Sequence, residues 1–202
     1  MDLVSAPLPA KHLGRKELGS VFALNLVQGL PAYFFTLALP VVLRDAGASL
    51  DIIGLTYIVW LPWALKWIWA PVFDSRPRLR LATLRISPAA LAMVFLSLIW
   101  FGPHGAAGPL LTMAALAATI GATLQVVLAA EVMNRSDGAV RATANALQVA
   151  GMTLGGVMGG AVLIWLGASI GWTAAILLTV VMIAVAGLSA FTFGPGEAMP
   201  AR

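Results

Sequence analysis

The chain has 202 residues, of which 60% are hydrophobic and 10% are charged, and its mean hydropathy is +0.94. Soluble domains carry about 25% charged residues, so this composition argues against a soluble protein and predicts an integral membrane protein with no separate soluble domain. The net charge of +4 argues against nucleic-acid binding, because the basic residues fall mainly between apolar stretches. The absence of cysteine excludes disulfides and thiolate metal sites.

Six apolar stretches have about the length of a membrane-spanning helix, which needs about 20 residues. In chain order they cover residues 18–43, 52–73, 86–101, 109–130, 143–166 and 172–193. The sequence therefore predicts an all-α membrane protein with one domain of six transmembrane helices over residues 18–193. Residues 1–17 form a charged segment without the apolar core of a secretory signal, and residues 194–202 form a tail.

The segments that connect the six stretches alternate in charge. The N-terminal segment, the connections over residues 74–85 and 131–142, and the tail together carry ten Lys and Arg residues, whereas the opposite side carries only Arg44. Positive charge is retained in the cytoplasm. Both termini are therefore predicted to be cytoplasmic.

The first stretch combines polar residues with residues that weaken a helix. Asn25 and Gln28 are three residues apart and share a helix face, and Gly29 and Pro31 lie near the middle of the predicted span. Broken helices with polar groups at mid-membrane commonly form transport sites, but Asn and Gln also hydrogen-bond between helices. Both interpretations fit this stretch.

The second stretch contains Lys66, the one basic residue inside a predicted span. Such a charge indicates ligand binding or gating. Alternatively, its long side chain reaches the cytoplasmic interface near Asp74, about 12 Å away along a helix. Trp60, Trp63 and Trp67 share a face by their spacing, and they either line a site for a bulky solute or pack at the interface.

The fourth and fifth stretches add polar candidates. Gln125 is expected within the membrane. Glu131 either pairs with Arg135 four residues later, which is the favoured interpretation, or takes part in proton coupling. Asn145 and Gln148 are candidates for polar contacts at the cytoplasmic end of the fifth helix. The fifth stretch also has glycines four residues apart, a spacing that predicts close helix packing; these are Gly151, Gly155, Gly156, Gly159 and Gly160.

The sequence contains no catalytic signature. His12 and His104 lie on opposite sides of the predicted topology, so they do not suggest a zinc site. The HExxH, GxSxG and P-loop motifs do not occur. We therefore predict a protein that is not an enzyme and that has no metal and no cofactor.

The segment from Gly54 to Asp74, GLTYIVWLPWALKWIWAPVFD, resembles the second helix of the major facilitator superfamily. The similarity is to the branch that holds bacterial muropeptide permeases and siderophore-uptake permeases. QGLPAYFF at residues 28–35 and NALQVAG at residues 145–151 resemble the first and fifth helices of the siderophore-uptake permeases. The resemblance covers most of residues 20–165 and the N-terminal half of a family with about twelve spans. Where this family often has two aspartates in the fourth helix, the chain has Val126 and Ala130.

The resemblance implies one half of a multi-pass secondary transporter in the bacterial inner membrane, acting on a siderophore-like or muropeptide-like organic solute. Because the family's transport path lies between two halves, it implies a homodimer or a second transporter half as partner. The implied substrate-binding residues are Gln28, Tyr33, Lys66, Gln125, Asn145 and Gln148, and the implied cytoplasmic gate is Asp74 with Arg78. The alternatives are a truncated or degenerate remnant and a non-transporting membrane subunit.

Overall fold

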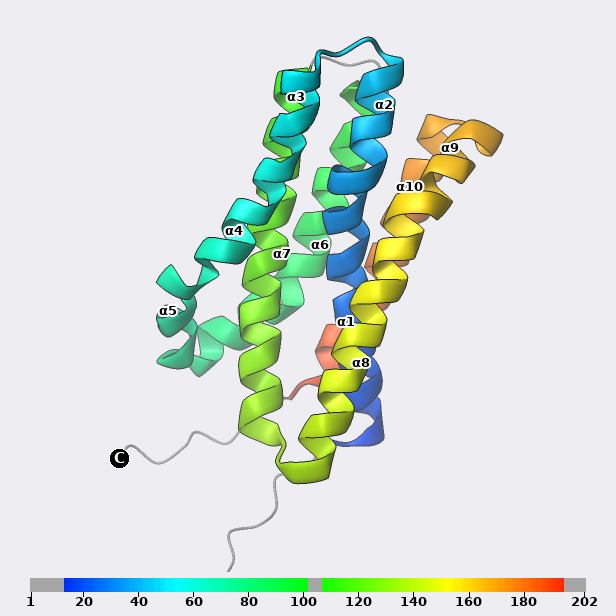
Figure 1. The fold of residues 1–202 in the computed structure, drawn as a ribbon. Coiled ribbons are helices and arrows are strands. Elements are labelled where there is room, and N and C mark those ends of the chain that lie inside the picture. Colours follow the sequence, from blue (N-terminus) through cyan, green and yellow to red (C-terminus); the bar gives the residue numbers. More distant parts are fainter. Residues whose placement is uncertain (1–12, 102–106, 195–202) are drawn as a thin grey trace, which may run out of the picture.

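The computed structural model describes residues 13–101 and 107–194, which fold into a bundle of helices (Figure 1). Five helices in this part of the chain are long and apolar enough to cross a membrane. They are α1 to α2 (Arg15–Asp45), α6 (Pro77–Phe101), α7 (Ala107–Arg135), α8 to α9 (Gly138–Ile170), and α10 with its last turn η5 (Trp172–Thr192). Large apolar side chains such as Trp100 and Trp165 are 77% and 65% exposed, as expected for helices that face lipid. The predicted all-α class is confirmed, and the arrangement fits a multi-pass membrane protein.

The first long helix forms the centre of the bundle. It consists of α1 (Arg15–Tyr33), the π-helical turn η1 (Phe34–Ala38) and α2 (Leu39–Asp45), and α1 contacts α6, α7, α8 and α10. Proline lacks an N–H and crowds the carbonyl four residues earlier, and η1 lies between Pro31 and Pro40. A wider π-helical turn accommodates such a misfit. The helix that Gly29 and Pro31 were expected to weaken is therefore continuous.

The predicted second span is not one of the five long helices. It is divided into five short segments, α3 (Leu50–Gly54), η2 (Leu55–Val59), α4 (Trp60–Leu65), η3 (Lys66–Ile68) and α5 (Ala70–Asp74). Pro62 and Pro71 each remove a backbone donor from this region. The segments run alongside α7 (Figure 1). Within the described residues, five long apolar helices are therefore present, and the prediction of six spans is not confirmed.

Several helices extend beyond the predicted apolar stretches. The predicted connection at residues 74–85 contains the start of α6, and the one at residues 131–142 is helical except at Ser136 and Asp137. A hydropathy pattern detects only the part of a helix that lies in lipid, whereas the backbone hydrogen bonds continue through charged turns. These two predicted connections are therefore largely helical, and Arg78 lies on a helix.

The remaining elements complete the two sides of the bundle. The helix after α7 consists of α8 (Gly138–Val157), the π-helical turn η4 (Met158–Val162) and α9 (Leu163–Ile170), and it is followed by α10 (Trp172–Gly187) and η5 (Leu188–Thr192). α8 packs along α1, while α10 packs against α6 and α1. At the end of the bundle near α9, the rings of Phe34, Phe35 and Phe95 pack with centroids 5.0 to 5.8 Å apart.

The packing of the first helix against the last turn of the chain can be tested by crosslinking. Ser20 Oγ and Thr192 Oγ1 lie 2.8 Å apart, and the chain has no native cysteine. We expect the Ser20→Cys, Thr192→Cys double variant to form a disulfide on oxidation, because the two side chains are in direct contact through their hydroxyl oxygens. A changed mobility in denaturing electrophoresis would report the bond.

The matched control is the Ser20→Cys, Ser169→Cys pair. Ser169 lies on α9, at the end of the bundle opposite to the start of α1 (Figure 1), so this pair should stay reduced. Equal crosslinking of the two pairs, or of neither, would contradict the arrangement of α1 and η5.

Candidate functional site

Five side chains from three parts of the chain form a continuous group, which we call the aromatic–lysine cluster: Tyr33, Trp60, Trp63, Lys66 and Gln125. The ring centroids of Tyr33 and Trp60 are 6.2 Å apart with the planes at 88°, and those of Trp60 and Trp63 are 6.3 Å apart. Lys66 Nζ lies 5.7 Å from the Trp63 ring centroid and donates a hydrogen bond to Gln125 Oε1. The cluster therefore brings together three of the predicted substrate-binding residues.

Two glycines allow the rings of the cluster to pack closely on neighbouring helices. A Cβ atom at Gly121 of α7 would lie 3.4 Å from Trp63 Cζ2, and one at Gly156 of α8 would lie 2.9 Å from Tyr33 Cδ2. Gly121 precedes Gln125 by one helical turn, so both face the lysine side of α7. The cluster is thus supported by α1, α7 and α8 together with the broken helix.

Within the described residues, Lys66 contacts neutral groups and no carboxylate. None of the ion pairs there includes Lys66. Its ammonium group interacts with the face of Trp63 and with the neutral amide of Gln125. The side chain is thus directed at α7, which favours a site within the bundle over a lysine that reaches for the interface.

Trp67 does not join the cluster, although its spacing from Trp60 and Trp63 predicted a shared face. Its side chain is 69% exposed. The backbone changes from α4 to the tighter turn η3 at Lys66, and this change shifts the angular positions that follow. The shared face was therefore predicted correctly for two of the three tryptophans.

The other predicted substrate contacts lie outside the cluster. Gln28 is fully buried on α1, and its Oε1 and Nε2 have no hydrogen-bond partner among the described residues. Asn145 is exposed and Gln148 is partly buried. By helical spacing these two share the face of α8 that carries Gly156, about 12 to 17 Å towards the start of the helix.

The predicted gate residues Asp74 and Arg78 are both exposed, and neither takes part in an ion pair of the described chain. The ion pairs form instead among Glu17, Arg80, Glu131 and Arg135, which we call the charged end cluster. Sequence reasoning missed Arg80 and Glu17 as members of such a network. The sequence did contain a signal for this network. Glu131 is one of the few acidic residues at the predicted cytoplasmic end of the helices, which is rich in arginine.

Glu131 holds the charged end cluster together. Its Oε1 accepts a hydrogen bond from Arg80 Nε at 2.6 Å, and its Oε2 accepts one from Arg135 Nε at 2.6 Å. The side chains of Arg80 and Glu131 are only 9% and 3% exposed. The predicted pairing of Glu131 with Arg135 is thus confirmed, and the pair is part of a buried triad.

Arg135 links this triad to both ends of the described chain. Its Nη1 lies 3.3 Å from Glu17 Oε1 on α1, and its Nη2 donates to the carbonyl oxygen of Gly194 at 2.7 Å. Arg80 also lies close to the carbonyl oxygen of Phe73 on α5, at 3.4 Å. One end of α1, α5, α6, α7 and η5 is therefore joined by a single charged network.

The predicted packing glycines of the fifth stretch lie against the first helix. Cβ atoms at Gly151 and Gly159 would overlap the carbonyl oxygens of Phe22 and Leu30. A Cβ at Gly155 would lie 2.5 Å from the carbonyl oxygen of Leu26. The glycines Gly156 and Gly160 instead face the side chains of Tyr33 and Leu37. α1 and α8 are therefore in backbone contact over more than two helical turns.

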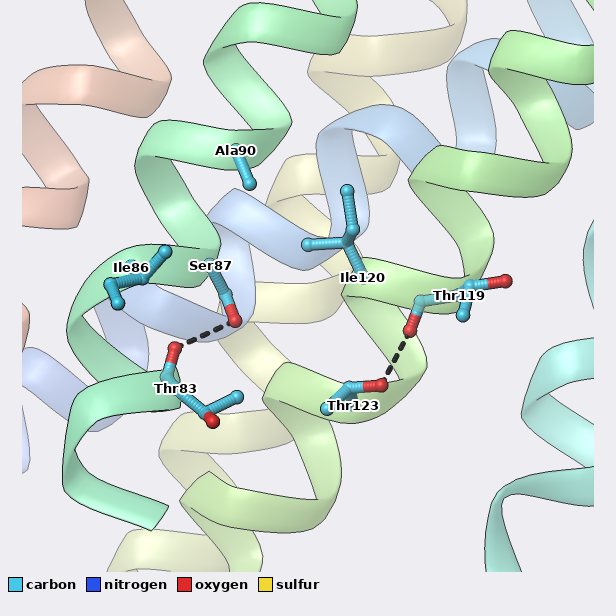
Figure 2. Close-up of a pocket in the computed structure, with 7 residues that line it drawn as sticks. All are labelled: Thr83, Ile86, Ser87, Ala90, Thr119, Ile120 and Thr123. Carbon is cyan, nitrogen blue, oxygen red and sulfur yellow. Dashed lines mark hydrogen bonds between the residues drawn. The ribbon is translucent and has the colours of Figure 1, made fainter. Parts of the chain in front are cut away.

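A shallow hollow of about 240 Å³ lies between α6 and α7. Figure 2 shows its lining, which comprises Thr83, Ile86, Ser87, Ala90, Thr119, Ile120 and Thr123. The hydroxyls of Ser87, Thr119 and Thr123 each donate to the carbonyl four residues earlier, so they are not free to donate to a ligand. By helical spacing the hollow lies on the side of α7 opposite to Gln125, and it is separate from the aromatic–lysine cluster.

The structure brings no group of three or more His, Asp or Glu side chains close enough to hold a metal ion within residues 13–101 and 107–194. His12 and His104 lie outside the described residues. The aromatic–lysine cluster consists of a cation, aromatic faces and an amide. Groups of these kinds bind ligands through charge, hydrogen bonds and ring contacts.

Comparison with known proteins identifies an uncharacterized relative. No family model matches the sequence, and no solved structure matches it. An uncharacterized protein of Haemophilus influenzae is 31% identical over 163 residues, which cover 76% of this chain and 38% of the relative. Because the alignment covers 76% of this chain but 38% of the relative, the relative is about twice as long as this chain.

Proposed function

We propose that this bundle forms one half of a membrane transporter of the major facilitator superfamily, which moves an organic solute by secondary active transport. The observation that carries the proposal is Lys66, a cation without a carboxylate partner in the described chain, set beside three aromatic rings. An ionisable residue inside a membrane span is costly to insert, and such residues usually mark a substrate or ion pathway.

The broken helix that carries Lys66 supports the same proposal. Transporters commonly build their sites on discontinuous helices, whose interrupted backbone is tolerated next to a cavity. In this proposal the segments α3 to α5 cross the membrane in pieces and supply the second of six spans. The resemblance of residues 54–74 to the second helix of the muropeptide and siderophore-uptake permeases further favours a siderophore-like or muropeptide-like solute.

A second set of helices would complete the transport path in this proposal. Tyr33, Lys66 and Gln125 remain only partly buried within the described bundle, so they are available to a solute held between two halves. The relative of about twice the length is consistent with a second half of similar size. That half is supplied either by another copy of this chain or by a separate set of helices.

In the proposed orientation, the charged end cluster lies at the cytoplasmic face of a bacterial inner membrane. The contacts of Arg135 gather the start of α1 and the end of η5 at this end, where most of the basic residues of the chain also lie. Lys and Arg prefer the cytoplasmic side of spans. Asp74 and Arg78, which are exposed at the same end, would form the cytoplasmic gate with the second half.

Uptake into reconstituted phospholipid vesicles with an imposed pH gradient tests this function. The solutes are a radiolabelled iron(III) siderophore that carries a free carboxylate and a radiolabelled N-acetylmuramyl peptide. We expect the unmodified chain to take up one of them, and Lys66→Met to lower the initial rate about 10-fold or more, since a charge-assisted contact is removed. Lys16→Met, at an exposed position on α1, is the control and should leave the rate unchanged.

Each result of the uptake assay has a stated consequence. No uptake of either solute by the unmodified chain would contradict transport by a homodimer and leave only a separate set of helices as the second half. Undiminished uptake by Lys66→Met would remove Lys66 from the path. Crosslinking of the protein in the same vesicles identifies the second half, because uptake by strictly monomeric protein would exclude the homodimer.

A further inference from the structure

The polar atoms of the aromatic–lysine cluster are mainly donors that lack acceptors. An ammonium group has three N–H donors, and Lys66 uses one of them on Gln125 Oε1. Because the amide oxygen faces the ammonium, the amide nitrogen of Gln125 faces away with two further donors. The indole N–H of Trp63 is buried without an acceptor among the described residues. The missing partner of this cluster is therefore a group that accepts several hydrogen bonds.

The charge of the cluster specifies that partner further. Lys66 contributes a single positive charge, and an ion in apolar surroundings is most stable when its charge is cancelled. The nearest acid along α7 is Glu131, six residues beyond Gln125 and about 9 Å along the helix. Both of its oxygens are already bound by Arg80 and Arg135. A group with one negative charge would neutralise the site, whereas a dianion would leave an excess negative charge.

The rings next to Lys66 specify the shape of the rest of the partner. Trp60 keeps 36% of its surface exposed and contacts both Tyr33 and Trp63. Aromatic faces prefer offset or edge contacts with other flat π-systems. The rings form a chain that starts with Trp63 at the Lys66 ammonium and continues through Trp60 to Tyr33, so one ligand can contact the charge and a neighbouring ring together.

We propose that the aromatic–lysine cluster binds an organic monoanion, a carboxylate attached to a flat unsaturated group. The carboxylate accepts hydrogen bonds from Lys66, Gln125 and the indole of Trp63, and the flat group lies against Trp60 and Tyr33. This inference rests on the proposed transport function, since it names the chemical group by which the same site would hold a larger organic solute.

Equilibrium binding of radiolabelled benzoate tests the inference, with the full chain in phosphatidylcholine nanodiscs. Benzoate should bind saturably. Benzamide has the same ring without the charge, and cyclohexanecarboxylate has the charge without a flat ring; each should bind at least about 10-fold more weakly. Lys66→Met should weaken benzoate binding about 10-fold or more and leave benzamide unchanged, because only the charged contact is lost.

Two variants separate the loss of the site from a loss of folding. Lys66→Arg keeps the charge, so it should retain most of the preference for benzoate over benzamide. Trp60→Leu keeps the charge and removes a ring, so it should abolish the preference for benzoate over cyclohexanecarboxylate. Lys16→Met is again the control and should bind benzoate as the unmodified chain does.

Specific outcomes would overturn the inference. Equal affinity for benzoate and benzamide, or unchanged benzoate binding by Lys66→Met, would show that Lys66 does not receive an anion. Loss of benzoate binding in nanodiscs with added phosphatidylglycerol would assign the site to a lipid headgroup instead of a solute. Binding does not require flux, so benzoate binding without uptake would reject only the transporter, whereas uptake independent of Lys66 would reject only this site.

Discussion

Replacing Glu131 with glutamine is expected to lower the free energy of unfolding by about 3 kcal/mol, because removal of one partner leaves a buried charge uncompensated. Arg80 and Arg135 each donate to one oxygen of Glu131. Glutamine retains one acceptor oxygen, and its amide nitrogen would face the second arginine as another donor. Arg80 is the more affected partner, because its side chain is only 9% exposed.

Thermal unfolding of the purified protein, followed by circular dichroism, measures this effect. A loss of about 3 kcal/mol corresponds to a midpoint lower by about 6 to 12 °C for a chain of this size. Glu17→Gln is the matched control, because the Glu17 pair with Arg135 is longer and both side chains are 20% exposed. Partly exposed pairs contribute about 0 to 1 kcal/mol, so the control should shift the midpoint by only a few degrees.

A second variant shows whether uncompensated charge causes the loss. The Arg80→Leu, Glu131→Leu double variant removes the buried cation together with its carboxylate, and Arg135 can still pair with Glu17. Apolar replacement of a buried ion pair is often neutral, so the double variant should be more stable than Glu131→Gln. If it is less stable, shape and hydrogen bonding hold this end of the bundle more than charge does.

The second large effect is expected at the contact between α1 and α8. Gly155→Ala should destabilise the bundle by about 1 to 3 kcal/mol, the range for overpacked sites. Its Cβ would lie 2.5 Å from the carbonyl oxygen of Leu26 and 3.0 Å from the Cα atom of Gly29. Both neighbours are backbone atoms, so relief requires the two helices to move apart.

Two control glycines on the same long helix separate this clash from the general effect of adding a methyl group. At Gly160 the nearest atom to a Cβ is Leu37 Cδ1 at 3.1 Å, which a flexible side chain can move, and at Gly167 no atom lies within 4 Å. Alanine favours helix over glycine by about 1 kcal/mol, so Gly167→Ala should be neutral or stabilising and Gly160→Ala intermediate. Thermal unfolding that ranks all three variants equally would contradict close packing at Gly155.

The parts of the fold that depend on local spacing could be predicted from the sequence. Apolar runs located five long helices, glycines at intervals of four located the surface that meets α1, and the i, i+4 spacing located the pair of Glu131 with Arg135. Each of these features repeats within one helix. The geometry of one helix therefore fixes each of them. The helix ends do not follow from apolar runs, because the backbone hydrogen bonds continue beyond the apolar residues.

The contacts that define the two clusters could not be derived in this way. The contact between Lys66 and Gln125 spans 59 residues, and the one between Arg80 and Glu131 spans 51. Such pairings depend on which helices lie beside one another. The spacing of residues within one helix does not determine this arrangement. Pro62 and Pro71 remove backbone donors and predict a bend in the second stretch, but the hydropathy pattern presents residues 50–74 as one span, so the division into five short segments was not predicted.

The break in residues 50–74 also determines how stiffness is distributed around Lys66. Gln125 lies on α7, a helix of 29 residues, whereas Lys66 opens η3, a turn of three residues between α4 and α5. A long helix resists bending through its continuous ladder of hydrogen bonds, and short segments pivot at their junctions. The hydrogen bond between Lys66 and Gln125 thus joins the stiff helix α7 to the more flexible short segments α4 to α5. A movement of α4 to α5 changes the position of Lys66 relative to Gln125 and leaves the backbone contact of α1 with α8 in place.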